Sequence, residues 1–339
     1  MKFSTLLVAG SSLLSAAVVQ VHGDAILPRS EVQRRDQLAR RCASAAGAFN
    51  AKRMTKRSNM VKRQATTAPE AETHYKTIQN ETCVMTPEVI MGPYVWPMSQ
   101  LIRTDMSEDQ PGVPLTLDIG VLDMATCEPL QNAMVSLWHY NATGDYSSFE
   151  ELDENLTFTE LKEKLGLTNV TYGITDLHTG NSTWLRGMYP TNKEGMMEMK
   201  TVFPGFYAGR AIHIHIQVFT HWTLAPNGTM RSGDLVSTGQ LYFDEAHTPL
   251  TILLRYTIRR VMALEPYAQH TQIRRTGNDV DKFIGGSMEG GYSSFVRVEP
   301  LDGDDVTKGM VGYITLGVDT AILSRPPNYI EPASPYEKK

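Results

Sequence analysis

The segment from Ile212 to Val218 alternates apolar and polar side chains with the period of a half-buried β-strand. This alternation places His213, His215 and Gln217 on one face and four aliphatic side chains on the other. Positions two residues apart on a strand are separated by about 6.5–7 Å at Cα, so both imidazoles can bind one metal. Buried imidazoles with no carboxylate nearby in the sequence need another polar partner. The segment therefore predicts a β-sheet fold with a metal site on one face of a strand.

Other short alternating segments, separated by turns rich in Gly, Pro and Asn, favour an all-β architecture. We expect further strands at Leu115–Val121, Ala133–Trp138, Met196–Val202, Ser237–Phe243, Ser294–Val298 and Val311–Val318, with the histidine strand extending over Ala211–Thr220. Strands of this length and spacing predict a mainly β fold, an antiparallel β-sandwich with irregular loops. One helix is expected at Ser147–Leu167, where Leu residues recur among acidic ones.

The N-terminus has the features of a secretory signal peptide. Lys2 precedes an apolar run from Leu6 to Val21, and residues 1–23 form the predicted signal. The apolar run is too short to span a membrane comfortably, so we expect cleavage, no membrane partner afterwards, and a soluble, secreted, extracellular product. Six Asn-X-Ser/Thr sequons agree with this route and predict a glycoprotein: Asn80, Asn141, Asn155, Asn169, Asn181 and Asn227.

Residues 24–63 form a basic segment with three Lys-Arg pairs at positions 52–53, 56–57 and 62–63. Two interpretations stay open. The pairs indicate dibasic processing of a pro-segment with a mature start near Gln64, or the segment is a retained, solvated helix over roughly Ser30 to Arg53.

The chain has three cysteines, Cys42, Cys83 and Cys127. Export to an oxidising compartment favours a disulfide between Cys83 and Cys127. Cys42 would then be unpaired, cleaved away or bridged to a second chain, and spacing alone does not determine the connectivity.

A net charge of −5 without a basic stripe in the C-terminal two-thirds argues against a nucleic-acid partner.

Two tyrosines are candidate oxygen ligands for the metal. Tyr207 follows the turn at Pro204-Gly205, which can direct its ring back toward the histidine strand, and Tyr146 lies just past the expected strand at Ala133–Trp138. The alternative roles are a core tyrosine for Tyr207 and a loop aromatic for Tyr146.

The chain resembles the intradiol ring-cleavage dioxygenases, and among them the secreted fungal-type branch. The resemblance covers roughly residues 80–320 and rests on an ordered set of motifs: Gly92-Pro93-Tyr94-Val95, Trp138-His139, Gly144-Asp145-Tyr146-Ser147, Leu185-Arg186-Gly187, Pro204-Gly205-Phe206-Tyr207, Arg210-Ala211-Ile212-His213-Ile214-His215 and Gly239-Gln240-Leu241-Tyr242-Phe243. The ordered set is far more specific than any one of its members.

The resemblance implies one non-haem Fe(III) per chain, held by Tyr146, Tyr207, His213 and His215, with O₂ as co-substrate. It further implies that a small catecholic ring is opened between its two hydroxylated carbons to give a muconate-type diacid. Phenolate oxygen suits the hard ferric ion, whose charge must drive deprotonation of the tyrosines. Tyr207 would be a ligand that also accepts a substrate proton.

Arg210 and Gln240 match the pair of residues that the family places beside the substrate. Arg210 would orient the substrate and stabilise negative charge on its ring. Strict alternation would direct Arg210 away from His213, so we expect the strand to begin after Arg210. Tyr94 either lines the substrate pocket or only packs, and His139 is expected to pack beneath the site.

The resulting organisation is a signal peptide (1–23), a basic pro-segment or helical extension (24–63), a linker and loop region (64–110), a β-sandwich catalytic domain (111–320) and a tail (321–339). The resemblance also implies a homodimer. Two rival hypotheses are another secreted His-rich metal oxidoreductase of the cupin type, which would need a Glu and a third His, and an inactive β-sandwich binding module.

Overall fold

The computed structural model describes residues 29–64, 83–84, 91–96, 100–170, 175–243, 245, 258–284, 293–303 and 305–321. Within these residues no helix combines the length and apolarity needed to cross a membrane. The expected signal peptide and the C-terminal tail beyond residue 321 lie outside the described residues.

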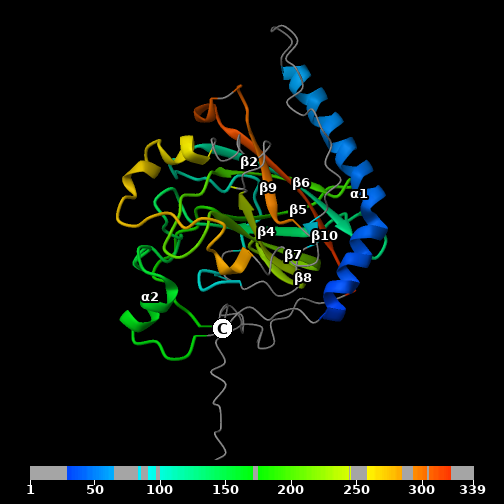
Figure 1. Cartoon of the computed structure of the whole chain (residues 1–339). Coiled ribbons are helices and arrows are strands. Elements are labelled where there is room, and N and C mark those ends of the chain that lie inside the picture. Colours follow the sequence, from blue (N-terminus) through cyan, green and yellow to red (C-terminus); the bar gives the residue numbers. More distant parts are fainter. Residues whose placement is uncertain are drawn as a thin grey trace, which may run out of the picture.

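The strands of the described residues form one curled, mixed sheet (Figure 1). Its order is β3-β2-β10-β9-β8-β7-β4-β5, with β1 beside β10 and β6 beside β2. The strands are β1 (Cys83–Val84), β2 (Pro114–Asp123), β3 (Glu128–Pro129), β4 (Met134–Trp138), β5 (Arg186–Pro190), β6 (Met196–Val202), β7 (His213–Leu224), β8 (Met230–Phe243), β9 (Phe295–Pro300) and β10 (Met310–Val318).

The prediction of a mainly β fold is confirmed, but the prediction of a purely antiparallel sandwich is wrong in part. Strand β10 runs parallel to both β1 and β2, and β9 runs parallel to β8. Each parallel pair joins strands far apart in the chain, and turn signals between neighbouring strands carry no information on such pairings. The short β8–β9 pairing also joins the two halves of the sheet into a single curled structure.

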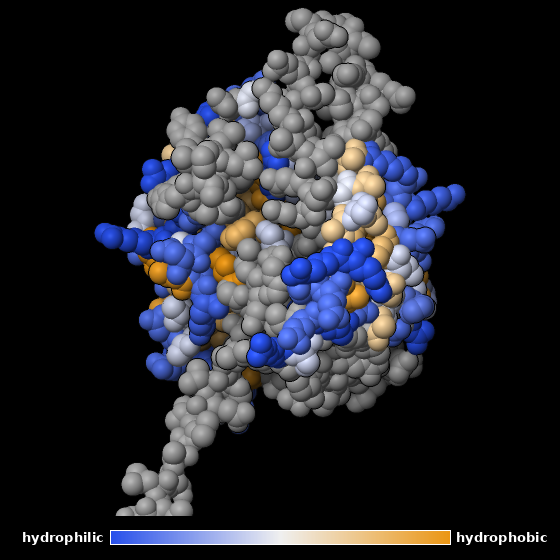
Figure 2. Space-filling view, turned by 45° about the vertical axis from the view of Figure 1, so that its right-hand side comes forward, coloured by the Kyte–Doolittle hydropathy of each residue, from blue (hydrophilic) through white to orange (hydrophobic). Residues whose placement is uncertain are grey.

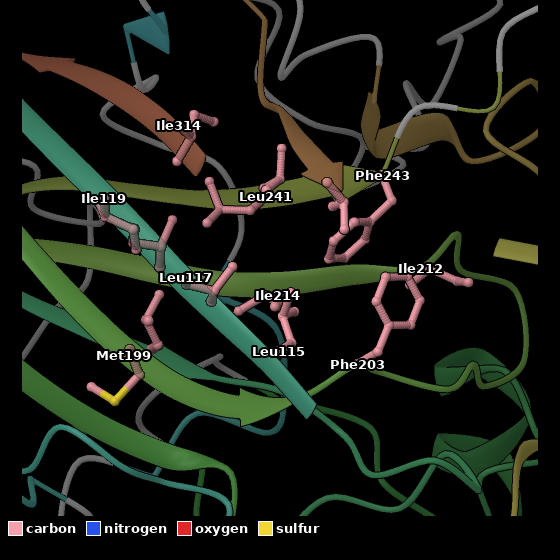
Figure 3. Packing of buried hydrophobic residues seen from close by; sticks show 14 of the residues in the cluster. Leu115, Leu117, Ile119, Met199, Phe203, Ile212, Ile214, Leu241, Phe243 and Ile314 are labelled. Atoms are coloured by element: carbon pink, nitrogen blue, oxygen red, sulfur yellow. The ribbon is translucent and has the colours of Figure 1, made fainter. Parts of the chain in front are cut away.

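The core lies between the two halves of this curled sheet. Figure 3 shows Leu115, Leu117 and Ile119 of β2 facing Ile214 of β7 and Leu241 of β8. The aliphatic face of β7 is thus inside the core, as the alternation predicts, and the opposite face carries the histidines. Hydrophilic residues cover most of the described surface in the view of Figure 2, and hydrophobic residues show only in limited areas between them.

The helix expected at Ser147–Leu167 is wrong except in its second half, where α2 spans only Phe158–Lys164. Thr157 begins α2 with a capping box, since its side chain accepts from the Glu160 backbone while Glu160 accepts from the Thr157 backbone. Residues 147–156 form turns instead, with the Phe149 amide donating to the Tyr146 carbonyl and the Leu152 amide donating to the Phe149 carbonyl. Two 3₁₀ turns, η1 (Tyr267–Gln269) and η2 (Val306–Lys308), and short helical segments at 258–262 and 282–284 complete the described helices.

The basic N-terminal segment forms a long helix, α1 (Arg29–Gln64), as the second interpretation of this segment predicts, and it is longer than expected. Its first half packs on the end of β2, where Cys42, Ala46 and Phe49 form a small apolar cluster with Leu122 and Met124.

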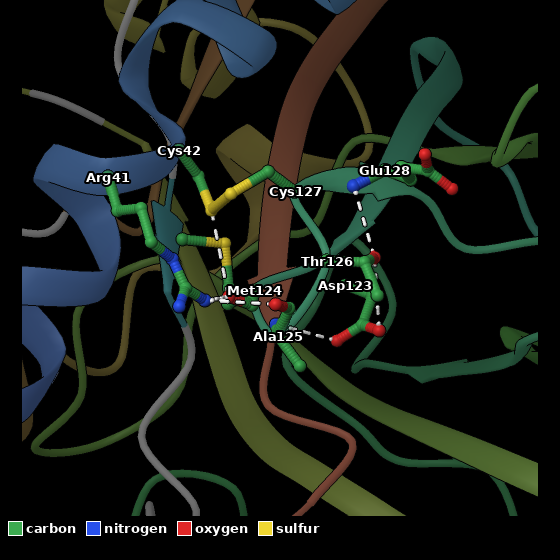
Figure 4. Close-up of a disulfide and its surroundings, with 8 residues drawn as sticks. All are labelled: Arg41, Cys42, Asp123, Met124, Ala125, Thr126, Cys127 and Glu128. Atoms are coloured by element: carbon green, nitrogen blue, oxygen red, sulfur yellow. Dashed lines mark hydrogen bonds between the residues drawn. A yellow bond between two sulfur atoms is a disulfide. The ribbon is translucent and has the colours of Figure 1, made fainter.

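The disulfide joins Cys42 to Cys127, so the prediction of a Cys83–Cys127 bond is wrong (Figure 4). The sheet register explains the difference. Cys83 lies beside Leu316, on the edge of β10 opposite to β2, which puts β1 two strands away from β2. Two strand spacings are about 9.6 Å, beyond the reach of a disulfide. Cys127 follows β2 in a turn that faces α1.

The sequons differ in their surroundings. Asn169, Asn181 and Asn227 are exposed, as glycosylation requires, and Asn80 lies outside the described residues. Asn155 is half-buried, and its amide donates to Glu154 while its oxygen faces His270. Asn141 is also half-buried, with its side-chain oxygen accepting from Thr143 and Asp145. The three exposed sites are therefore the best candidates for glycans.

Candidate metal centre

The histidines lie at the start of β7, on the face opposite to the aliphatic core. Both are buried, His213 completely and His215 to within 1 %. Register places His215 beside Trp138 of β4 and Gln240 of β8, and it places His213 beside Tyr242. The β-sheet thus fixes the positions of the two imidazoles and of Gln240 relative to one another.

The two tyrosines are carried by loops that lie backbone against backbone. Gly205 donates to the Asn141 carbonyl at 3.0 Å, and a Cβ at Gly205 would lie only 2.2 Å from the Ala142 carbonyl oxygen. Gly144, at φ +103°, would place a Cβ 2.5 Å from the Phe206 carbonyl oxygen. The glycines of the two tyrosine motifs are therefore required by this close approach. Because the two loops approach so closely, the rings of Tyr146 and Tyr207 lie side by side next to β7.

The four predicted ligands converge on one small volume. The Nε2 atoms of His213 and His215 are 3.2 Å apart, and the Tyr146 hydroxyl is 3.0 Å from His215 Nε2. The ring of Tyr207 lies 5.7 Å from the rings of both Tyr146 and His213, centroid to centroid. Bonds of about 2 Å from a metal to ligands at right angles would set those ligand atoms about 3 Å apart. The spacing of the three donor atoms fits a shared metal ion.

The hydrogen bonds of the imidazoles fit the same role. His213 Nδ1 lies 2.7 Å from the Ala211 carbonyl, which can only accept, so Nδ1 carries the proton and Nε2 keeps its lone pair. The ring of His215 stacks on the indole of Trp138 at 4.8 Å and 5°. A second aromatic wall is formed by Tyr94, which stacks on Tyr146 at 4.4 Å.

Burial controls the protonation states of these groups. It lowers the pKa of His213 and of His215 well below the usual value, and Arg210 lowers both further, so the imidazoles are neutral. Burial also raises the pKa of Tyr146 well above its usual value, with Tyr207 adding to the effect. For Tyr207 burial raises the pKa, while Arg210 opposes it. The site accordingly favours neutral imidazoles and phenols, and a highly charged cation would be needed to convert the phenols to phenolates.

Arg210 precedes β7, which begins after Arg210 as expected but at His213, two residues later than predicted. The Arg210 guanidinium turns toward the site. The guanidinium donates to the side-chain oxygen of Gln240 and, at 3.1 Å, to the Tyr242 hydroxyl. Because Arg is only a donor, the oxygen of the Gln240 amide must face it, and the Tyr242 hydroxyl also donates to this oxygen at 2.6 Å. The orientation of the Gln240 amide is therefore fixed.

Asp281 holds this arrangement in place and was missed by the sequence analysis. Its buried Oδ2 accepts from Arg210 Nε at 3.0 Å and from the Ala211 backbone at 2.8 Å, while Oδ1 accepts from the Phe283 backbone at 2.9 Å. The Phe283 ring stacks under the guanidinium at 4.3 Å. Asp281 lies 71 residues from Arg210, and no motif or spacing connects the two.

Tyr140 was also missed. It is fully buried, its hydroxyl accepts from the His213 backbone at 2.9 Å, and its ring packs edge-on against both Tyr146 and Tyr207. Its position directly after Trp138-His139 was the only signal in the sequence. His139 packs beneath the site as expected, since its two ring nitrogens lie 2.6 Å from the Tyr140 carbonyl and 2.7 Å from the Thr201 hydroxyl.

Comparison with known proteins finds that the chain is similar to dioxygenases. A dioxygenase family model matches residues 90–247. The solved structure of an intradiol ring-cleavage dioxygenase from Tetranychus urticae is similar at a TM-score of 0.52 and 25 % identity, covering 70 % of this chain and 95 % of that one. A second dioxygenase crystal structure is similar at a TM-score of 0.51 and 25 % identity, again covering 70 % and 95 %. No curated protein matches the chain.

The family-model match and the fold make the chain similar to the intradiol ring-cleavage dioxygenases, which confirms the resemblance seen in its sequence. The comparisons support ring-cleaving dioxygenase chemistry in general, and they do not distinguish the secreted fungal-type branch, which stays a prediction.

Proposed function

We propose that this protein is a secreted Fe(III) dioxygenase that opens a small catecholic ring between its two hydroxylated carbons, using O₂, to give a muconate-type diacid. The observation that carries the proposal is the position of His215 Nε2, which lies 3.2 Å from His213 Nε2 and 3.0 Å from the Tyr146 hydroxyl. The ring of Tyr207 lies beside that of Tyr146. Neutral imidazole and phenolate oxygen are suitable ligands for ferric iron.

His213, His215, Tyr146 and Tyr207 would hold the iron. When bound, ferric iron would supply the positive charge that converts the two phenols to phenolates and a centre at which the catecholate and O₂ react. No group of three or more His, Cys, Asp or Glu side chains suited to a metal occurs among the residues that the structure describes. A metal site here therefore depends on the tyrosines, and this argues against the cupin-type alternative.

Tyr207 would accept a proton at its phenolate oxygen from one hydroxyl of the catechol. The positive charge of Arg210 helps Tyr207 to hold its anionic form before this transfer, because it opposes the rise in the pKa of Tyr207 that burial causes. The same charge would stabilise negative charge that develops on the substrate ring. The near-complete burial of Tyr146, Tyr207, His213 and His215 excludes bulk water from this transfer.

The test is spectroscopic and catalytic. The purified protein with stoichiometric iron should show the visible charge-transfer band of tyrosinate on Fe(III), and Tyr207→Phe should shift this band and impair turnover. Tyr189→Phe is the matched control, because Tyr189 is an exposed tyrosine away from the centre. Oxygen uptake against a panel of catechols, with product spectra, should give the intradiol product.

Colourless protein with stoichiometric iron would contradict the ligand assignment. A coloured protein that consumes no O₂ with any catechol would instead support the inactive binding module.

A further inference from the structure

Helix α1 is divided into a docked half, which carries the pairs Arg34-Arg35 and Arg40-Arg41, and a second half that contains all three Lys-Arg pairs. The residues of α1 that are described as buried end at Phe49, and Cys42, Ala46 and Phe49 follow the i, i+4, i+7 spacing of one helix face. This face packs on Leu122 and Met124 at the end of β2. Figure 1 shows the first half of α1 beside the end of β10.

Polar contacts hold the same half. Arg34 forms an ion pair with Asp319, and the Arg41 guanidinium donates to the carbonyls of Met124 and Ala125 (Figure 4). The disulfide between Cys42 and Cys127 adds a covalent link to the catalytic domain.

The Lys-Arg pairs begin just after this docked half. They lie at positions 52–53, 56–57 and 62–63, and α1 ends at Gln64, one residue past the last pair. Lys52 is exposed. The ends of helices open more readily than their docked parts, and a protease needs its substrate locally unfolded. Cleavage at any pair would leave the docked half and its disulfide untouched.

We propose that a protease specific for Lys-Arg cuts α1 after Arg53, Arg57 or Arg63 and produces a two-chain protein whose N-terminal peptide stays attached through Cys42–Cys127. The reaction is hydrolysis of one peptide bond. Water supplies the OH of the new carboxyl group on the arginine and the hydrogen of the new amino group on the following residue. No oxidant or reductant is needed. Under this proposal the segment is cut at the Lys-Arg pairs, as in the first interpretation of the basic segment, and it is retained, as in the second.

This inference rests on the proposed secretory route, which supplies both the oxidising compartment and the protease. It does not depend on iron or on the dioxygenase activity. Its consequence for the fold is that the apolar residues Leu122 and Met124 stay covered after cleavage.

The experiment treats the full-length purified chain with a subtilisin-type protease specific for Lys-Arg and compares reducing with non-reducing gels and intact masses. We expect one species of nearly unchanged mass without reductant. With reductant it should separate into the large domain and a peptide ending at Arg53, Arg57 or Arg63. A Cys42→Ser, Cys127→Ser double variant should lose the peptide even without reductant, and replacing all six basic residues of the pairs by Gln should prevent the cut.

Two outcomes would overturn the proposal. An uncut chain, under conditions where the protease cleaves a Lys-Arg control peptide, would show that the pairs are not accessible for processing. Release of the peptide without reductant from the chain with native cysteines would show that the disulfide does not retain it. Iron content and colour are measured on the same samples, so a failure of the proposed dioxygenase function would be seen separately.

Discussion

Gly92 lies directly against the imidazole of His215 and shows how closely the site is packed. Its φ is +75°, and an added Cβ would lie 3.2 Å from His215 Cε1 and 3.8 Å from Nε2, the nitrogen that we propose binds the metal. Gly92→Ala should therefore displace this ring and weaken iron binding. Gly166→Ala is the matched control, because Gly166 has a φ of +65° and open space around it.

Both variants should lose about 1 kcal/mol of unfolding free energy through backbone strain, but only Gly92→Ala should lose iron and charge-transfer absorbance. Equal iron content in the two purified variants would show that Gly92 is not needed for the position of His215.

Asp281 is expected to act as a positioning residue for Arg210. Asp281→Asn removes the buried negative charge that orients the guanidinium through Nε. We expect kcat to fall by about 10–100-fold with a smaller change in KM, as for other residues that support a functional group from behind. The iron spectrum should be retained, which separates this effect from unfolding. Asp279→Asn makes the same charge change at an exposed position in the same segment and should leave kcat unchanged.

His139 is expected to make the folded state sensitive to acid. Burial lowers the pKa of His139 to about 4, below its ordinary value of 6.5, with the Tyr140 carbonyl opposing this shift. Between these values the unfolded chain binds a proton that the folded chain excludes. The contribution of the neutral His139 to the free energy of unfolding is therefore fully present above pH 6.5. It is lost as the pH falls toward 4, at about 1.4 kcal/mol per pH unit.

Urea unfolding of the wild type and of His139→Gln at about pH 7 and about pH 5 measures this effect. Between about pH 7 and about pH 5 the unfolding free energy of the wild type should fall by about 2 kcal/mol more than that of the variant. Identical pH dependence of the two proteins would contradict the assignment of a neutral, buried ring.

At the scale of single elements, the stability of helix α2 depends on its N-terminal cap. It has seven residues, too few to be stable alone, and the capping box at Thr157 and Glu160 satisfies backbone groups at its start. Thr157→Ala should cost about 1 kcal/mol of local stability, whereas Thr157→Ser should retain the cap. Hydrogen exchange of the α2 amides is the measurement, and equal protection in both variants would show that the cap is not required.

The β7 element illustrates which part of the site could be predicted. Its alternation correctly indicated which side chains share a face, because strand geometry is local. The turns between Tyr146 and α2 were read as helix, because the recurring leucines have helical spacing while the backbone contacts between residues 141–142 and 205 are not visible in the sequence.

At the scale of the whole molecule, the disulfide links the N-terminal helix to the sheet across a sequence separation of 85 residues. Loss of such a cross-link by Cys42→Ser with Cys127→Ser should lower the unfolding free energy by about 2–4 kcal/mol. Reductant should destabilise the wild type to a similar extent and leave the double variant unchanged. Peptide mapping without reduction should recover Cys42 joined to Cys127, and recovery of Cys83 joined to Cys127 would contradict the structure.

The sequence by itself determined the four candidate ligands, Tyr146, Tyr207, His213 and His215, together with most strands of the sheet. Strand alternation, turn glycines and ordered motifs are local properties, so they can be read along the chain. Only the tertiary structure decided the parallel pairings of β10, the partner of Cys127 and the role of Asp281 behind Arg210. Each of these is a contact between residues far apart in the chain, and such contacts depend on how the sheet curls.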